Sequence, residues 1–189
     1  MSERMKVILI IIFTVILAAY TAYWSSKSLQ TLTLYECLQD TSCYAYKDTN
    51  SVTFKDPISG KERTYRNKYA RAVTFEFKRI NKFFPLLGDD SDKTVSIITA
   101  CCSASLVGVS VFLLININFR RIRYKLEKAI SIILLGLLMG AVAFIIVQFA
   151  PSLLFKTTPE FKDAAIYAIA LLAGMFSESF YNRLAILFK

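Results

Sequence analysis

The chain has 189 residues, of which 55% are hydrophobic and 14% aromatic, and it carries a formal net charge of +9. This composition is more apolar than that of a typical soluble domain and indicates a membrane protein. The sequence contains no histidine, which excludes His-based acid–base catalysis, Ser-His-Asp triads and the commonest zinc sites. It also lacks Walker and GxGxxG motifs, so we expect no catalytic residue, metal or cofactor, and no direct binding of nucleic acid.

Four stretches without charged residues follow one another along the chain, at 7–24, 94–117, 129–150 and 164–176. At about 1.5 Å per residue the first three span roughly 27 to 36 Å, enough for a hydrocarbon core of about 30 Å. The fourth is short by itself, but Thr158 and Pro159 are typical of a helix start and predict a helix over 159–176. Because lipid cannot hydrogen-bond a bare backbone, each stretch is predicted to be helical.

The predicted fold is therefore an all-α membrane bundle of four transmembrane helices, with a small mixed α/β extracytoplasmic domain between the first two. Its first segment could be a cleaved signal peptide, but the paired small residues that signal peptidase reads are missing, which favours an uncleaved anchor. Tyr20, Tyr23 and Trp24 would form the outer aromatic belt of that anchor. The predicted segments are 1–24, 25–93, 94–117, 118–128, 129–150, 151–158, 159–176 and 177–189.

Positive charge predicts the orientation in the bacterial inner membrane. The short segments at the N-terminus, between the second and third helices and at the C-terminus hold nine Lys and Arg residues, against two in 151–163. Both termini are therefore expected in the cytoplasm and residues 25–93 in the periplasm. The long segment itself holds twelve Lys and Arg residues, but it exceeds the length over which the positive-inside rule applies.

Within 25–93, Cys37 and Cys43 are spaced as expected for a disulfide in an oxidising compartment, and two unpaired thiols in a small core are the alternative. Residues 51–66 predict a β-hairpin, because alternating apolar positions flank the turn residues of 56–60. Residues 68–84 fit both a helical stripe and a strand alternation, and periodicity leaves the two open. A domain of this size buries only a modest core, which favours a sensing or contact surface.

Small residues recur at four-residue spacing on the second, third and fourth predicted helices, where they let helix backbones approach closely in lipid. Two interpretations stay open: the faces hold one protomer together, or they assemble a homo-oligomer, with a tetramer as one candidate. The residues concerned are Ala100, Ala104, Gly108, Gly136, Gly140, Ala164, Ala168, Ala170 and Gly174.

Little polarity lies inside the predicted helices, and no ionisable group falls at the membrane midplane, which disfavours a carrier or a proton pump. A narrow pore is compatible with the sequence. Its candidate lining residues are Asn116 and Gln148, with Ser103, Ser105 and Ser110 as further polar groups on the second helix.

The last segment, 177–189, is predicted to extend the fourth helix as an amphipathic helix that begins at the cytoplasmic interface. It either lies on lipid or joins the basic segment 118–128 in docking a soluble partner, and the basic segment is expected to bind anionic lipid in any case. The predicted contact residues are Arg120, Arg121, Arg123, Lys125, Lys128, Glu178, Asn182 and Arg183.

The motif at 173–180, AGMFSESF, resembles the A-G-F-S-E-R-F ending of small multi-pass proteins from bacterial anti-phage loci. Met175 stands as an insertion, and Ser179 replaces the common Arg. With its size, four predicted helices and extracytoplasmic loop, the chain is similar to the membrane subunits of the Kiwa anti-phage defence system, KwaA. The resemblance implies an oligomeric sensor at the envelope that works with a cytoplasmic DNA-binding partner, KwaB.

The leading hypothesis from the sequence is a non-enzymatic, oligomeric inner-membrane sensor and scaffold of an anti-phage system, which detects an envelope or phage signal and docks a cytoplasmic effector resembling KwaB. The alternative is a pore-forming effector or ion channel that depolarises the cell. A plain structural or lipid-binding membrane protein is the third hypothesis, and it would show neither a partner nor conductance.

Overall fold

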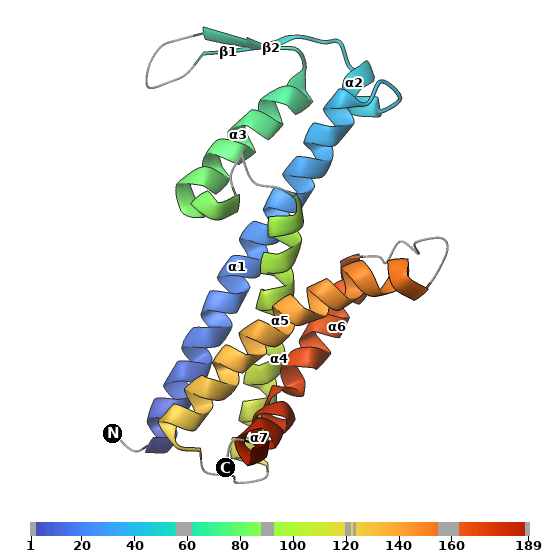
Figure 1. The fold of residues 1–189 in the computed structure, drawn as a ribbon. Helices are drawn as coiled ribbons and strands as arrows, with labels where there is room; N and C mark the ends of the chain where they lie inside the picture. Colours follow the sequence, from blue (N-terminus) through green and yellow to red (C-terminus); the bar gives the residue numbers. More distant parts are fainter. Residues whose placement is uncertain are drawn as a thin grey trace. The chain divides into compact units, whose positions relative to one another are not determined.

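The computed structural model describes residues 3–55, 62–87, 93–119, 122, 124–154 and 163–187, with side chains at all of these except 55, 147–154, 163–164, 184–185 and 187. The described chain is mostly helical, with one small sheet (Figure 1). In chain order the elements are α1 (Glu3–Gln39), α2 (Tyr44–Lys47), β1 (Val52–Lys55), β2 (Glu62–Tyr65), α3 (Lys68–Phe83), the 3-10 turn η1 (Pro85–Leu87), α4 (Lys93–Asn118), α5 (Leu126–Leu154), α6 (Asp163–Met175) and α7 (Ser177–Leu187).

Three of the described helices are long and apolar enough to cross a membrane: α1, α4 and the part of α5 over Leu126–Ile146. The fourth predicted crossing has a shorter counterpart in α6, which has 13 residues and is about 20 Å long at 1.5 Å per residue. The predicted start of that crossing at Thr158 and Pro159 lies outside the described residues. The structure therefore shows three candidate spans and leaves the fourth as a prediction.

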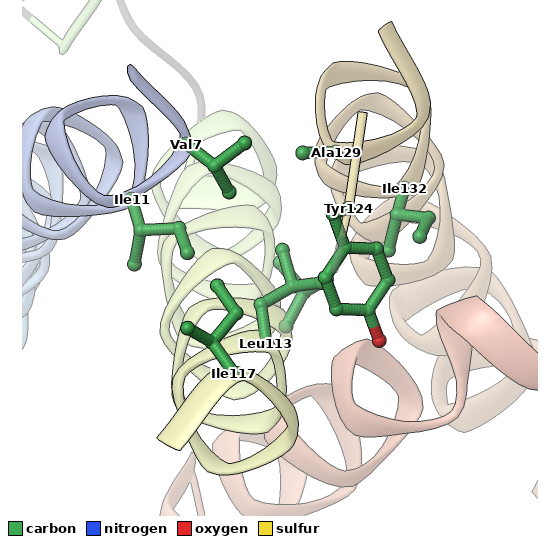
Figure 2. Close-up of a cluster of buried hydrophobic side chains, with 8 residues drawn as sticks. Val7, Ile11, Leu113, Ile117, Tyr124, Ala129 and Ile132 are labelled. Atoms are coloured by element: carbon green, nitrogen blue, oxygen red, sulfur yellow. The ribbon is translucent and has the colours of Figure 1, made fainter. Parts of the chain in front are cut away.

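The chain divides into two compact units, which we describe separately. The helical unit comprises Met1–Tyr23 and Ile97–Lys189, and the hairpin unit comprises Trp24–Ser96. In the helical unit, one buried cluster joins the beginning of α1, the second half of α4 and the beginning of α5 (Figure 2). Its members are Val7, Ile11, Val109, Leu113, Ile117, Tyr124, Ala129 and Ile132.

A second buried cluster in the helical unit joins α4, α5 and α6. It contains Cys101 of α4, Ala143 and Phe144 of α5, and Ile166 and Ala170 of α6. Small side chains on α4 and α6 let the three helices approach closely, as expected where packing replaces the hydrophobic effect.

The hairpin unit is built around the antiparallel pair β1–β2 and the helix α3. Val52 pairs with Tyr65 and Lys55 with Glu62, which confirms the predicted hairpin, while its turn lies outside the described residues. The open choice for residues 68–84 is settled as a helix. Val73, Phe77 and Ile80 form its buried face, and the helical spacing of these three side chains explains why the helix is preferred over a strand.

Asn67 fixes the beginning of α3. Its side-chain oxygen accepts a hydrogen bond from the backbone N–H of Ala70 at 2.8 Å, which caps the helix. The amide nitrogen donates to the backbone oxygens of Ala45 and Asp48, each at 2.7 Å. A single fully buried side chain thereby connects α3 with the segment around α2.

Helical structure extends beyond two of the predicted segments. The segment predicted for the first crossing ends at 24, and the helix α1 continues past it to Gln39. Residues 25–39 contain no glycine or proline to stop it, and Leu29, Leu32, Leu34 and Leu38 give this stretch apolar side chains. The end of an apolar run is therefore not the end of the helix. The predicted outer loop 151–158 is likewise helical over its first four residues, which belong to α5.

Candidate functional site

A buried polar cluster lies in the helical unit, at the end of α4 and the beginnings of α5 and α7. Tyr124 donates its hydroxyl proton to Glu178 Oε2 at 2.6 Å. Asn116 Nδ2 donates to the same carboxylate oxygen and to the Tyr124 hydroxyl, each at 2.9 Å. As whole residues, Asn116, Tyr124 and Glu178 are 1%, 5% and 8% exposed. Two donors thus converge on a carboxylate that water barely reaches.

Local structure positions each member of this polar cluster. Asn116 lies in the last turn of α4, and its backbone oxygen accepts a hydrogen bond from Ile122 N–H at 3.0 Å, which turns the chain back. Tyr124 follows just before α5, with its ring in the apolar cluster and its hydroxyl directed toward α7 (Figure 2). Glu178 stands in the first turn of α7, where the helix dipole favours a negative charge.

Among the described residues, Lys128 in the first turn of α5 forms an ion pair with the carboxylate. Its Nζ lies 3.8 Å from Glu178 Oε1, and its side chain is 39% exposed where that of Glu178 is 11% exposed. The ammonium group also lies 5.6 Å from the ring centroid of Tyr124 and 5.9 Å from that of Tyr181. An isolated buried carboxylate is costly, so the donors and this cation are what make its burial tolerable.

The orientation of the Asn116 amide follows from the chemistry of its partner. An ionised carboxylate only accepts hydrogen bonds, so the Asn116 NH₂ group, not its oxygen, faces Glu178. Asn116 Oδ1 is buried, and among the described residues it has no hydrogen-bond partner. The amide is therefore held by its contact with the carboxylate and the tyrosine hydroxyl.

The motif at 173–180 has a structural role at this place. Gly174 of α6 lies against the backbone of Ser105 in α4, so closely that a Cβ atom would overlap it. Ser177 is fully buried and donates its hydroxyl proton to Gly174 O at 2.7 Å. Phe176 forms a turn between α6 and α7, but the hydrogen bonds Phe176 N to Leu172 O and Phe180 N to Phe176 O continue across it. The motif therefore delivers Glu178 into the polar cluster.

The small-residue faces pack inside the chain. Gly108 of α4 lies against the backbone of Leu171 in α6, as Gly174 does against Ser105. On α5, a Cβ atom at Gly140 would come within 2.8 Å of Cys102 Cα, and one at Gly136 within 2.9 Å of a Val109 side-chain atom. Ala100 and Ala170 are buried, and Ala104 packs on the same cluster. These four glycines pack against neighbouring helices of the same chain, so their spacing is explained without an oligomer interface. Ala168 is exposed, and the side chain of Ala164 lies outside the described part.

The polar groups predicted to line a pore are hydrogen-bonded within the protein. Ser103 Oγ lies 2.7 Å from Thr21 Oγ1 of α1, Ser105 donates to Gly136 O at 2.5 Å, and Ser110 donates to Leu106 O at 2.7 Å. Asn116 belongs to the polar cluster, where it is buried and hydrogen-bonded, and its pore-lining role stays a prediction. The Gln148 side chain lies outside what the structure describes.

The predicted contact residues divide into three groups. Lys125, Asn182 and Arg183 are exposed, and Lys128 is partly exposed. Glu178 is buried, so its predicted role as a surface contact was wrong: its carboxylate is used inside the protein. Arg120, Arg121 and Arg123 lie outside the described residues.

In the hairpin unit, Cys37 and Cys43 form a disulfide, with Cα atoms 5.4 Å apart, around a short turn that follows α1. Inside this turn the Ser42 backbone N–H and hydroxyl both donate to Asp40 Oδ1, at 2.9 and 2.8 Å. These two hydrogen bonds lower the pKa of the Asp40 carboxyl. The disulfide closes the turn at the end of the long helix.

Sequence reasoning missed Tyr124, the residue that links the polar cluster to the apolar cluster. The only signal was its position, as one of two aromatic residues, with Phe119, in the basic segment 118–128. Comparison with protein-family models, curated proteins and solved structures found no match.

Proposed function

We propose that this chain is a non-enzymatic integral-membrane sensor and scaffold, which crosses the bacterial inner membrane four times and docks a soluble effector at its cytoplasmic end. The observation that carries the proposal is the buried polar cluster of Asn116, Tyr124 and Glu178. Its hydrogen bonds tie α7 to the end of α4 and the beginning of α5. They make one defined surface from segments that would otherwise be separate loops and tails.

The same hydrogen bonds support the fourth crossing. The 29-residue helix α5 leads away from Tyr124, and the chain returns to the polar cluster at Glu178 by way of α6 (Figure 1). If α5 spans the membrane, a return to the same end requires a second passage. The short helix α6 would complete that passage with its flanking residues and the start of α7. Together with the positive-inside count, this favours cytoplasmic termini and a periplasmic hairpin unit.

The proposed docking surface consists of exposed polar residues held on either side of the polar cluster: Lys125, Asn182 and Arg183. Its positive charge suits an acidic partner surface, because complementary charges speed encounter and fix orientation. At the same end of the helical unit, this charge would also hold the headgroups of anionic lipids.

The anti-phage setting of the proposal comes from the resemblance of residues 173–180 to the Kiwa membrane subunits. It implies an effector resembling KwaB and an oligomeric assembly. Because Gly108, Gly136, Gly140 and Gly174 already pack within one chain, an oligomer would be built through other surfaces.

The test is co-expression with the neighbouring reading frames, followed by purification in mild detergent. We expect a soluble protein encoded there to co-purify with the wild type, and to be largely lost from a double variant Lys125→Gln/Arg183→Gln. The matched control, Lys47→Gln/Lys68→Gln, removes the same charge from the hairpin unit and should retain it. No retained protein in the wild type, or equal loss in both variants, would refute docking at this surface.

A further inference from the structure

The helical unit contains a cavity of about 530 Å³ next to the polar cluster. Its lining comes from the beginning of α1, the end of α4 and the segment before α5. Its volume falls within the usual range for small-molecule sites, roughly 300 to 1,000 Å³. The lining residues are Glu3, Arg4, Val7, Ile117, Asn118, Ile122 and Tyr124.

The lining separates into an apolar floor and a polar mouth. Val7, Ile117 and the Tyr124 side chain are buried, and Ile122 adds apolar surface. Arg4 and Asn118 are exposed, and neither makes an ion pair or side-chain hydrogen bond with another described residue. The negative charge of Glu3 is compensated by Lys6, whose Nζ lies 2.7 Å from Glu3 Oε1. Among the described lining residues, Arg4 is therefore the positive charge that remains available at the mouth.

The position of the cavity suggests what binds there. Arg4 precedes the apolar stretch 7–24, and Asn118 follows the apolar stretch 94–117, so the cavity lies where the membrane interface is expected. A guanidinium group forms paired hydrogen bonds with phosphate oxygens, and an amide can donate one more. An acyl chain would find the apolar floor directly beside this polar mouth.

We propose that this cavity is a binding site for one anionic phospholipid of the cytoplasmic leaflet, with the headgroup phosphate at Arg4 and Asn118 and an acyl chain along Val7, Ile117 and Ile122. Basic pockets between membrane helices on the cytoplasmic side are a known way to bind such headgroups. The inference rests on the membrane orientation of the proposed function, but not on its soluble partner.

The test is native mass spectrometry of the protein purified in mild detergent and supplied with phosphatidylglycerol or phosphatidylethanolamine. We expect one phosphatidylglycerol to be retained in preference to phosphatidylethanolamine. Arg4→Gln should lower that retention about fivefold, the effect of roughly one interfacial charge. The matched control Lys125→Gln removes the same charge at the same end without lining the cavity. It should lower retention much less than Arg4→Gln, because an exposed lysine attracts anionic lipid only diffusely.

A second variant tests the apolar floor without changing charge. Ile122→Trp should fill the cavity and reduce retention, while circular dichroism remains that of the wild type. Equal retention by wild type and Arg4→Gln would overturn the site, and so would an equal loss with Lys125→Gln, which would indicate diffuse attraction. Displacement by millimolar inorganic phosphate would point to a free anion and not to a lipid. If the wild type retains the soluble partner but no phosphatidylglycerol, this site alone would be refuted.

Discussion

The hydroxyl of Tyr124 and the carboxylate of Glu178 are hydrogen-bonded at 2.6 Å, although 54 positions separate them in the sequence. Between them the chain passes through α5 and α6. This single contact brings the beginning of α7 back to the beginning of α5. Tyr124 also packs its ring in the apolar cluster of α1, α4 and α5, so one side chain serves both the apolar core and the polar cluster.

We expect Tyr124→Phe to lower the free energy of unfolding by about 1.5 to 3 kcal/mol, the usual contribution of a hydrogen bond to a charged group. Denaturant unfolding in detergent, followed by circular dichroism, would measure it. Tyr181→Phe is the matched control, because Tyr181 packs against the same cluster and no hydrogen bond of its hydroxyl occurs in the described part. Equal stability of the two variants would contradict the role given to the Tyr124 hydroxyl.

Substitutions at Glu178 and Lys128 should lower the free energy of unfolding by different amounts. Glu178→Ala removes the acceptor of the buried Tyr124 hydroxyl and one of the two acceptors of the Asn116 amide, which should cost about 2 to 5 kcal/mol. Glu178→Gln keeps one acceptor oxygen and should cost less. Lys128→Met should cost under about 1 kcal/mol, because its ion pair is long and partly exposed. A larger loss of stability with Lys128→Met than with Glu178→Ala would show that the ion pair, and not the hydrogen bonds, stabilises the polar cluster.

Glycine-to-alanine substitutions should destabilise the protein more where the glycine faces a backbone than where it faces a side chain. Gly108→Ala and Gly174→Ala place a methyl group into the backbone of the facing helix, so α4 and α6 must move apart, at an expected cost of about 1 to 3 kcal/mol or more. Gly136→Ala meets a valine side chain and should cost less. Thermal unfolding in detergent would rank the three. If these glycines instead formed an oligomer interface, Gly108→Ala would change the oligomeric state and leave protomer stability intact.

The disulfide predicts a simple labelling pattern. In protein purified without reductant, Cys37 and Cys43 should resist alkylation, and both should react after reduction and unfolding, as read from peptide masses. Replacing both by serine should cost about 2 kcal/mol, the entropy of closing so short a loop. Alkylation of both cysteines in unreduced protein would place the hairpin unit in a reducing compartment and count against its periplasmic location.

The part of the fold that the sequence predicts is the part with local causes. Turn residues between alternating strands predict the β1–β2 hairpin, and uninterrupted apolar runs predict α1, α4 and α5 as long helices. The end of α1 at Gln39 is not visible in hydropathy, because residues 25–39 pack through leucines at helical spacing within a more polar stretch. Local reasoning also leaves α3 open between two periodicities.

The candidate site depends on contacts between distant segments, and this is why the sequence does not predict the burial of Glu178. An acidic residue just beyond an apolar helix is typical of a membrane interface. Its burial is tolerated because Asn116, 62 positions away, and Tyr124, 54 positions away, supply hydrogen-bond donors to the carboxylate. The small-residue spacing correctly indicates close helix approach, but it does not reveal whether the partner helix belongs to the same chain.

The central claim is that the polar cluster and α7 lie at the cytoplasmic end while the hairpin unit lies outside, and single-cysteine labelling in intact cells tests it most directly. In a background with Cys101→Ala and Cys102→Ala, the exposed positions Lys78→Cys and Asn182→Cys would be treated separately with a membrane-impermeant maleimide. We predict labelling at 78 in intact cells, and at 182 only after permeabilisation. Labelling at both positions in intact cells would contradict the four-crossing account and the docking surface proposed with it.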